Sequence, residues 1–334
     1  MGDARIADLP QALQMVRFRA GTGPRFLLTV DTEEEFDWSQ PFARNRYRLD
    51  SLPTLRKFQQ FCEGFAVAPL YLVDYPVADS PLAAEILGPA LAAGKAEIGI
   101  QLHPWVNPPF TENVNDYNSF SGNLPIGLEI AKLSRLRERI VERLGAEPLV
   151  YRAGRYGAGT NTASILREAG VAIDSSVRAR FDYSDAGGPD YRAMPIRPWW
   201  VGPPGSLMEV PLTTLYCGAL RRAGATLYPA LSRAPRLRGL FARTRLLERI
   251  PLTPEGVTGR EAVRAIAAAL TERLPLLVFS FHSPSLCPGH TPYVRSNADL
   301  DAFYDWWRTV FAVLKARGVR PTSAKELMAS VELA

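Results

Sequence analysis

Short apolar runs recur along the chain and alternate with longer segments that carry helical periodicity. Several runs are continuously apolar, which is typical of strands buried on both faces of a sheet. They predict eight strands, at 26–30, 67–73, 97–102, 149–152, 171–173, 208–212, 276–281 and 319–321. Such alternation over 334 residues indicates a parallel α/β sheet, either open or closed.

Helix signals are clear in four of the intervening segments. Apolar residues spaced three and four apart predict a helix over 130–144, which Gly145 ends. Capping boxes at Thr258–Glu261 and Ser323–Glu326 predict the starts of two more. A wide apolar stripe over 300–314 predicts a helix that packs on the core. Because no repeat or low-complexity linker interrupts this pattern, we expect a single domain.

Polar side chains directly follow six of the predicted strands. The carboxyl ends of parallel strands meet at one edge of a sheet or barrel, where ligands bind and chemistry occurs. We therefore expect these side chains to converge on one active site. The residues concerned are Asp31 with Glu33, Asp74, His103, Arg152, Asp174 and His282.

The chemistry of this set suits metal-assisted attack of water on a carbonyl group. Asp31 and Glu33 offer a base and a metal ligand, and His103 offers a further ligand. Arg152 can keep a carboxylate ionised by pairing with it. His282 can serve as a general acid.

Each of these residues also has a purely structural interpretation. The acidic run at 31–35 fits a solvated turn equally well, and Arg152 fits one half of a buried ion pair. Asp174 and the two serines after it can cap the next segment. The histidines favour the functional interpretation, because the chain has only three and two of them, His103 and His282, follow strands.

Five motifs, in order over about 25–328, resemble those of the NodB-type polysaccharide deacetylases, carbohydrate esterase family 4. They are TVDTEEEFDW at 29–38, EIGIQLHPWVNPP at 97–109, YRAGRYG at 151–157, DSS at 174–176 and FSFHSPSL at 279–286. The resemblance implies a distorted (β/α) barrel with about seven parallel strands over 25–334, after an N-terminal extension at 1–24. It also implies removal of an N-acyl group, usually acetyl, from an amino sugar or polysaccharide precursor.

The resemblance further implies roles for single residues. Asp31 is expected to be the base, oriented by Arg152. His282 is expected to be the general acid, with its ring braced by Asp174. Tyr156 is expected to donate its backbone N–H to the oxyanion.

Three more residues are expected to contact the substrate beside Tyr156. They are Asp74, Trp105 and Arg155.

The metal motif departs from the His-x-x-x-His pattern of the family. Asn107 stands in the place of the second histidine; an alignment anchored on Glu-Ile-Gly instead puts Gln101 in the place of the first. We expect a divalent metal, with zinc as the first choice, near Glu33, His103 and Asn107. Because an amide oxygen is a weaker zinc ligand than imidazole, weaker binding, a harder metal or no metal are the alternatives.

The net charge of +5 is unevenly distributed. Between 220 and 250, eight arginines accompany a single acid, Glu248. This Arg-rich insertion, at about 218–252, is interpreted either as a solvated surface or as a surface for an anionic sugar, nucleotide or lipid headgroup. The second interpretation includes an anionic substrate and peripheral contact with a membrane. Nucleic acid is not expected, because neither aromatic interleaving nor a helix-turn-helix pattern accompanies the charge.

The sequence also bears on the compartment. No apolar run reaches the roughly 18–20 residues of a transmembrane segment, and the first residues lack the apolar core of a secretory signal. Cys62, Cys217 and Cys287 form neither a disulfide framework nor a zinc pattern. We therefore expect a cytoplasmic protein acting on a nucleotide sugar, a lipid-linked intermediate or a precursor of a cell-surface polysaccharide.

Three other functions fit parts of the sequence. The first is a metal-free carbohydrate-binding protein on a decayed deacetylase fold. The second is a hydrolase of a non-sugar amide. The third, ranked last because it leaves His282 without a purpose, is a glycosidase that uses paired carboxylates.

Overall fold

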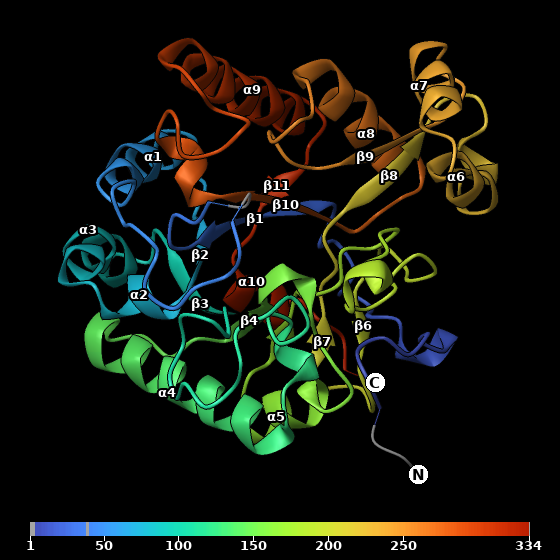
Figure 1. Cartoon of the computed structure of the whole chain (residues 1–334). Helices are drawn as coiled ribbons and strands as arrows, with labels where there is room; N and C mark the ends of the chain where they lie inside the picture. The colour runs from blue at the N-terminus through green and yellow to red at the C-terminus, as the bar shows by residue number, and fades with distance from the viewer. Residues whose placement is uncertain (1–3, 38–39, 334) are drawn as a thin grey trace.

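A curled sheet lies at the centre of the computed structural model, which describes residues 4–37 and 40–333, and helices cover its outer face (Figure 1). Seven of its strands run parallel in spatial order: β10 (Leu276–His282), β1 (Arg25–Thr32), β2 (Leu70–Val73), β3 (Glu97–Leu102), β4 (Val150–Ala153), β5 (Ile173–Asp174) and β7 (Met208–Glu209). At one edge of the sheet, β6 (Trp199–Trp200) pairs antiparallel with β7. Away from that edge, β11 (Arg320–Pro321) pairs parallel with the first two residues of β1. The curl makes a half-barrel, which confirms the predicted distorted (β/α) barrel in a single domain.

Eight helices of the described residues pack around this sheet or close its ends. They are α1 (Thr54–Glu63), α2 (Tyr75–Asp79), α3 (Pro81–Ala92), α4 (Ile126–Leu144), α5 (Thr162–Glu168), α8 (Gly259–Thr271), α9 (Asn297–Ala316) and α10 (Ala324–Ala329). Single turns of 3₁₀ helix lie in the connections, at η1 (Ala12–Gln14), η2 (Ser121–Asn123), η3 (Gly154–Tyr156), η4 (Ser184–Ala186), η5 (Arg221–Ala223) and η6 (Ser283–Leu286). Within the described ranges, no helix is both long and apolar enough to cross a membrane.

The predicted helix ends are confirmed where side chains cap them. The capping boxes begin α8 at Gly259 and α10 at Ala324, and Gly145 ends α4 in the left-handed conformation, with a φ of 64°. The prediction for 208–212 was too long, because only two residues form regular β7. Beyond β7 the chain continues extended, and the backbone N–H of Val210 donates to the carbonyl of Asp174 at 2.8 Å.

The two faces of β1 serve different purposes. Phe26 and Leu28 pack outward in the cluster that includes the aromatic residues of α9, whereas Leu27 belongs to a second cluster inside the curl. Side chains alternate along a strand, so Asp31 points to the same side as Leu27. The register pairs Asp31 with His282 of β10. The sheet therefore brings together two residues that lie 251 positions apart in sequence.

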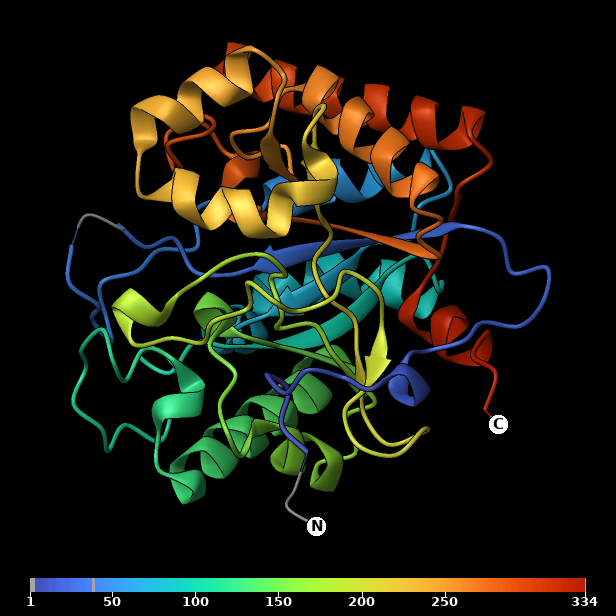
Figure 2. The ribbon, with the colours of Figure 1, turned by 90° about the vertical axis from the view of Figure 1, so that its right-hand side faces the viewer.

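The Arg-rich insertion forms a small appendage on the barrel. Strands β8 (Thr214–Cys217) and β9 (Glu248–Pro251) pair antiparallel, and α6 (Gly224–Ser232) and α7 (Pro235–Arg243) lie between them in the chain. Tyr216, Tyr228, Leu231 and Leu247 bury a local apolar cluster under these helices. Figures 1 and 2 show α6 and α7 at the periphery, beside the hairpin and α8.

The segment before β1 lies against the barrel. The N–H of Val16 donates to the carbonyl of Pro198 at 3.0 Å, and the N–H of Arg19 donates to that of Ser330 at 2.9 Å. Ile6 is buried in the main core. The N-terminal extension, as far as it is described, therefore packs on the domain instead of standing free.

Candidate active site

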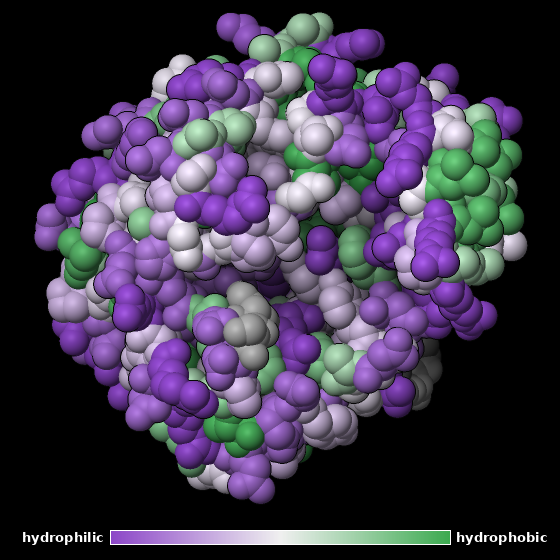
Figure 3. All heavy atoms as spheres, turned by 45° about the horizontal axis from the view of Figure 1, so that its top comes forward, coloured by the Kyte–Doolittle hydropathy of each residue, from purple (hydrophilic) through white to green (hydrophobic). Residues whose placement is uncertain are grey.

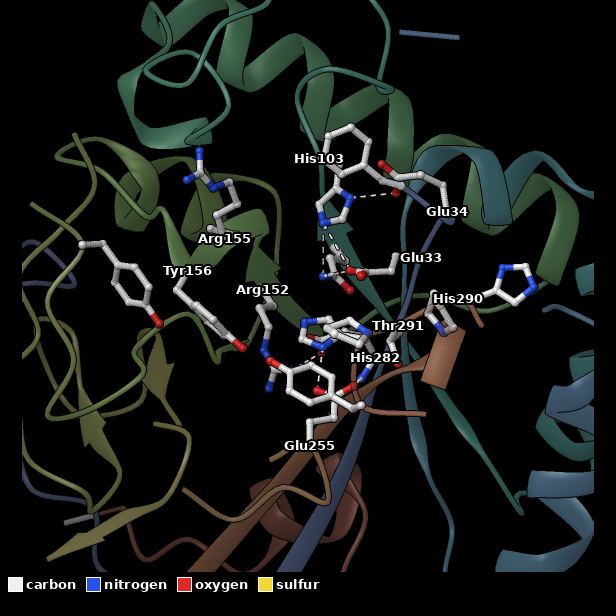
Figure 4. A pocket seen from close by; sticks show the side chains of 18 residues that line it. Glu33, Glu34, His103, Arg152, Arg155, Tyr156, Glu255, His282, His290 and Thr291 are labelled. Carbon is white, nitrogen blue, oxygen red and sulfur yellow. Dashed lines mark hydrogen bonds and ion pairs between the residues drawn. The ribbon is translucent and has the colours of Figure 1, made fainter. Parts of the chain in front are cut away.

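A cavity of about 340 Å³ opens at the carboxyl ends of the parallel strands. We call it the strand-end cavity. Figure 3 shows a hollow surrounded by hydrophilic side chains on the face toward which these strand ends point. Five of the predicted strand-end residues line the cavity: Asp31, Glu33, His103, Arg152 and His282. Figure 4 labels Glu33, His103, Arg152 and His282. The predicted convergence therefore holds for these five residues.

Arg152 and Asp31 form a buried ion pair in the cavity. Nη1 of Arg152 contacts Oδ1 of Asp31, as the sequence predicts. Its Nη2 donates to Thr29 Oγ1 at 3.1 Å and to Ser175 Oγ at 3.0 Å, and its Nε donates to the Ser175 carbonyl at 2.9 Å. These bonds hold the guanidinium in place, so a charged donor is fixed against Asp31.

His282 lies between two carboxylates. Its Nε2 is 3.8 Å from Asp31 Oδ2, and its Nδ1 is 2.8 Å from Glu255 Oε2. The backbone N–H of His282 also donates to Glu255 Oε1 at 3.1 Å, which fixes the carboxylate and the ring together. Figure 4 shows Glu255 on the side of the ring away from Glu33 and His103. About a third of the His282 side chain (32%) is exposed, so its free edge can reach a bound molecule.

The charges around His282 favour its protonated form. Burial lowers the pKa of the imidazole, but the negative charges of Glu255, Glu33 and Asp31 outweigh burial and raise the pKa from 6.5 to about 10. In the same pair, burial raises the pKa of Glu255, but the charge and hydrogen bonds of His282 give a net lowering. At neutral pH the pair is therefore an imidazolium held by a carboxylate.

The prediction that Asp174 braces His282 was wrong. Asp174 lies opposite Glu209 across the β5–β7 pair and accepts a hydrogen bond from Ser176 Oγ at 2.6 Å. Both acids are fully buried, and burial raises the pKa of each. Because β5 contains only two residues, it ends beneath the cavity, and Glu255 in the loop before α8 takes the position beside His282.

The δ nitrogen of His103 faces a buried group of acids. Nδ1 is 2.9 Å from Glu34 Oε2, while Trp105 Nε1 donates to Glu34 Oε1 at 2.8 Å. Asp74 Oδ2 accepts from the backbone N–H of Glu34 at 2.7 Å. Glu34, Asp74 and His103 offer ligand atoms within 4.8 Å of one another, so this group could hold a metal ion. It also fits the pattern in which a carboxylate orients a metal-binding histidine through its second nitrogen.

The ε nitrogen of His103 faces the cavity. It lies 3.5 Å from Glu33 Oε2 and 3.2 Å from the side-chain nitrogen of Gln101, which in turn is 3.0 Å from Glu33 Oε2. The side-chain oxygen of Gln101 is buried without a hydrogen-bond partner in the described structure. Rotating the amide by half a turn directs this oxygen at Glu33 and His103, and a cation could then satisfy all three groups. The residues therefore fit a divalent metal at this position.

Burial changes the ionisation of the acids in this region. It raises the pKa of Glu33 to about 7, although the positive charges of His282 and His103 act in the opposite direction. Burial likewise raises the pKa of Glu34 to about 7 and that of Asp74 well above its usual range. A metal ion bound here would favour the ionised forms, because it competes with protons for the same oxygens.

Besides Asp174, three more of the predicted residues do not line the strand-end cavity. Asn107 was expected to be a ligand, but its amide nitrogen donates to the carbonyls of Pro108 and Lys132 at 2.7 and 2.9 Å and holds the loop. Asp74 and Trp105 were expected to contact the substrate. Asp74 instead caps α2 and supports Glu34, and the Trp105 ring stacks behind His103 at 4.4 Å.

Arg155 and Tyr156, the other two predicted substrate contacts, do line the cavity. Both have left-handed backbones, with φ of 56° and 63°, a conformation that is uncommon for residues other than glycine and is often found at functional sites. The Tyr191 hydroxyl donates to the carbonyl of Tyr156 at 2.8 Å, and the Arg155 guanidinium lies 4.2 Å from the Phe120 ring. The surrounding contacts therefore hold this turn in its strained form.

Two residues of the site gave no strand-end signal. Glu255 lies in a Pro-Glu-Gly turn, and Tyr293 lies in the loop before α9; both line the cavity. Glu34 lies within the acidic run that follows β1, where Glu33 received the role of ligand. Only the three-dimensional arrangement distinguishes Glu34, which points to His103 Nδ1, from Glu33, which lies 3.5 Å from His103 Nε2.

The chain shares its fold with proteins of known structure. No protein-family model and no curated protein matches the chain. A candidate glycoside hydrolase or deacetylase from Parabacteroides distasonis superposes with a TM-score of 0.57 and 11% identity, over 93% of this chain and 71% of the other. The GH57 branching enzyme from Thermococcus kodakaraensis gives a TM-score of 0.52 and 10% identity, over 94% and 72%.

A third solved structure covers almost the whole of both chains. It is a candidate polysaccharide deacetylase from Mycobacterium smegmatis, with 17% identity, a TM-score of 0.45 and coverage of 95% of this chain and 98% of the other. Identities this low show similarity of fold only. At that level the predicted resemblance is confirmed: the chain shares its distorted (β/α) barrel with solved carbohydrate-active proteins of deacetylase and glycoside hydrolase type.

Proposed function

We propose that the chain is a metal-dependent hydrolase that removes an N-acyl group from an amino sugar or a polysaccharide precursor. The observation that carries this proposal is the position of His282. A protonated imidazole, held by Glu255, lies at the cavity beside the ion-paired carboxylate of Asp31. A base and an acid therefore lie side by side, as hydrolysis of an amide requires.

Four residues of the chain have separate proposed roles in the hydrolysis. Arg152 forms an ion pair with Asp31 and holds it in place, and Asp31 is the proposed base that takes a proton from the attacking water. As the tetrahedral intermediate collapses, His282 gives its proton to the departing nitrogen, because an amide anion is a very poor leaving group. The strained turn at Tyr156 is the proposed source of a backbone N–H for the oxyanion.

Glu33, His103 Nε2 and Gln101 are the residues proposed to hold the metal. A divalent cation at this position would polarise the carbonyl and lower the pKa of the attacking water. Glu34 is a positioning residue, since its bond to Nδ1 directs the free lone pair of His103 at the cavity. Zinc stays the first choice, although an amide in place of a second imidazole favours a harder ion such as Mn²⁺ or Mg²⁺ more than the family pattern does.

The competing functions make different demands on the same site. A glycosidase needs two carboxylates that are free to face the scissile bond. Here Asp31 is ion-paired with Arg152, Glu255 is ion-paired with His282, and Glu33 lies 3.5 Å from His103. The three carboxylates therefore already have partners within the protein. A metal-free binding protein has no need of a protonated His282. The geometry thus favours amide hydrolysis, and the sugar substrate rests on the motif resemblance and on the fold.

The proposal predicts a leaving-group dependence for His282. Purified protein supplied with zinc or manganese should release amine from N-acetylated amino sugars, and His282→Ala should lower turnover by about 10²–10⁴. On an activated aryl ester the loss should be much smaller, because an aryloxide departs without a proton. Equal losses on both substrates, or loss of the metal from His282→Ala, would exclude His282 as the acid.

A further inference from the structure

A second and broader cavity, of about 970 Å³, lies between the Arg-rich insertion and the barrel. Glu255 and Tyr293 line both this cavity and the strand-end cavity, so the two are neighbours. We call the broader one the arginine groove, because six arginines line it. They are Arg178, Arg238, Arg243, Arg245, Arg249 and Arg264.

The acids of the arginine groove already have other partners. Glu248 forms an ion pair with Arg264, and Glu255 holds His282. Glu261 closes the capping box at the start of α8. In the described structure, the other five arginines of the groove have no carboxylate within ion-pair distance, and the groove therefore carries an excess of positive charge.

Two of these arginines are held in place before any ligand arrives. The guanidinium of Arg249 lies 3.6 Å from the centre of the Phe181 ring and donates to the carbonyl of Arg180 at 2.7 Å. Arg178 lies 4.0 Å from the same ring, and its Nη1 is 3.4 Å from the Tyr183 hydroxyl. Two like charges held against one ring repel each other, and a bound anion would relieve that repulsion.

We propose that the arginine groove binds a phosphate or diphosphate group of the same molecule whose N-acyl group enters the strand-end cavity. Arginine forks match phosphate oxygens in geometry, and five unpaired cations exceed the charge of a single carboxylate. This inference rests on the proposed function for its sugar part. Its anion-binding part stands on the groove alone.

Helix α7 and the end of α6 offer a matched pair of double variants. Arg238 and Arg243 are exposed and line the groove, whereas Arg233 and Arg236 are also exposed but lie outside it. Replacing either pair with serine removes the same charge from the same part of the surface. Because all four side chains are exposed, neither double variant should disturb the fold.

The first test is direct binding of inorganic pyrophosphate, measured by calorimetry at low salt on the full chain. Arg238→Ser with Arg243→Ser should raise the dissociation constant about tenfold. Arg233→Ser with Arg236→Ser should change it less than about twofold. Pyrophosphate also binds divalent metals, so the comparison between variants carries the test. Equal losses in both variants, or no binding by the wild-type protein, would overturn the proposal.

The second test separates a soluble substrate from a lipid headgroup. We call the Arg238→Ser, Arg243→Ser double variant the groove variant and the Arg233→Ser, Arg236→Ser double variant the outside variant. With uridine diphosphate N-acetylglucosamine as a soluble probe, the KM for amine release should be about tenfold higher for the groove variant than for the outside variant. If the source is a lipid, the groove variant should instead lose sedimentation with vesicles of phosphatidylcholine and phosphatidylglycerol. Vesicle binding lost equally in both variants would assign the charge to a membrane surface and overturn the groove. If the two double variants differ in pyrophosphate affinity as expected but the wild-type protein releases no amine, the proposed function is refuted while the proposal that the groove binds an anion stands.

Discussion

The charge on His282 depends on its neighbours more than on its own chemistry. Glu255 makes the largest contribution that raises the pKa of His282, against burial that lowers it. His282 could be identified from the sequence because it follows a predicted strand. It could not identify Glu255, because a glutamate in a Pro-Glu-Gly turn has the same local pattern as any solvated turn. His282 was therefore predictable from sequence, and the carboxylate that raises its pKa was not.

The change Glu255→Gln tests this dependence through pH. Without the carboxylate, the pKa of His282 should fall from about 10 by at least about one pH unit, so the proton needed by the leaving group is lost at lower pH. A profile of kcat/KM between pH 6 and 11 should show the alkaline limb displaced toward neutral pH. Glu138→Gln, on the exposed face of α4, is the charge-matched control. If the alkaline limb of the profile does not move, Glu255 is not the group that raises the pKa of His282.

The same pair affects stability with a defined sign. The pKa of His282 in the folded protein is above its ordinary value of 6.5, so the pairing stabilises the fold fully below pH 6.5. That contribution is lost as the pH rises from 6.5 toward about 10. The free energy of unfolding of the wild-type protein, relative to Glu255→Gln, should therefore decline over this window.

Glu34 is expected to act on the metal through His103. Glu34→Gln should weaken metal affinity about 10–100-fold, the usual effect of losing a carboxylate that orients a ligand histidine. Glu33→Gln should remove binding altogether. Because burial raises the pKa of Glu33 to about 7, affinity should also fall about tenfold for each pH unit below 7.

Competition with a coloured chelator measures these affinities. If the metal instead occupies the Glu34, Asp74 and His103 group, Asp74→Asn should abolish binding while Glu33→Gln retains it. That result would place the metal on the opposite nitrogen of His103.

The lengths of the strands explain how much of the site could be predicted from the sequence. The register of β1 with β10 pairs two apolar runs that the sequence predicts as strands, and it sets Asp31 beside His282. β5 and β7 were harder to predict, because two-residue strands leave almost no periodic pattern. The misplaced role of Asp174 follows from this, since one or two residues decide whether a strand-end side chain reaches the cavity or stays beneath it.

The turn after β4 also positions His103. An added Cβ on Gly154 would meet Cδ2 of His103 at 2.5 Å and the carbonyl oxygen of Leu102 at 2.6 Å. Gly154→Ala should therefore displace the imidazole and lower metal affinity about tenfold or more. Gly88→Ala in α3, where an added Cβ has no neighbour within 4 Å, should leave affinity unchanged and add up to about 1 kcal/mol of stability. Unaltered metal affinity in Gly154→Ala would show that the ring is not constrained by this turn.

At the scale of the whole chain, the structure combines a barrel with the appendage that the Arg-rich insertion forms. The barrel could be predicted because strand and helix signals agree along most of the chain. The position of the Arg-rich insertion beside the strand-end cavity could not, since the cavities share Glu255 and Tyr293, and Tyr293 lies about 40 residues beyond the insertion in sequence. The sequence treated the eight arginines between 220 and 250 as one surface, but only four of them line the groove: Arg238, Arg243, Arg245 and Arg249.

If the proposed function is correct, water attacks the acyl carbon and not a sugar carbon. The direct measurement is hydrolysis of the methyl glycoside of an N-acetylated amino sugar in ¹⁸O-labelled water, followed by mass spectrometry of both products; the glycoside is used because a free reducing sugar exchanges its anomeric oxygen with water. We expect the label in acetate, an unlabelled methyl glycoside that carries a free amine, and neither product with Asp31→Asn. Release of methanol from a sugar that keeps its acetyl group would identify a glycosidase and contradict the proposed function, as would the absence of any labelled product in the presence of metal.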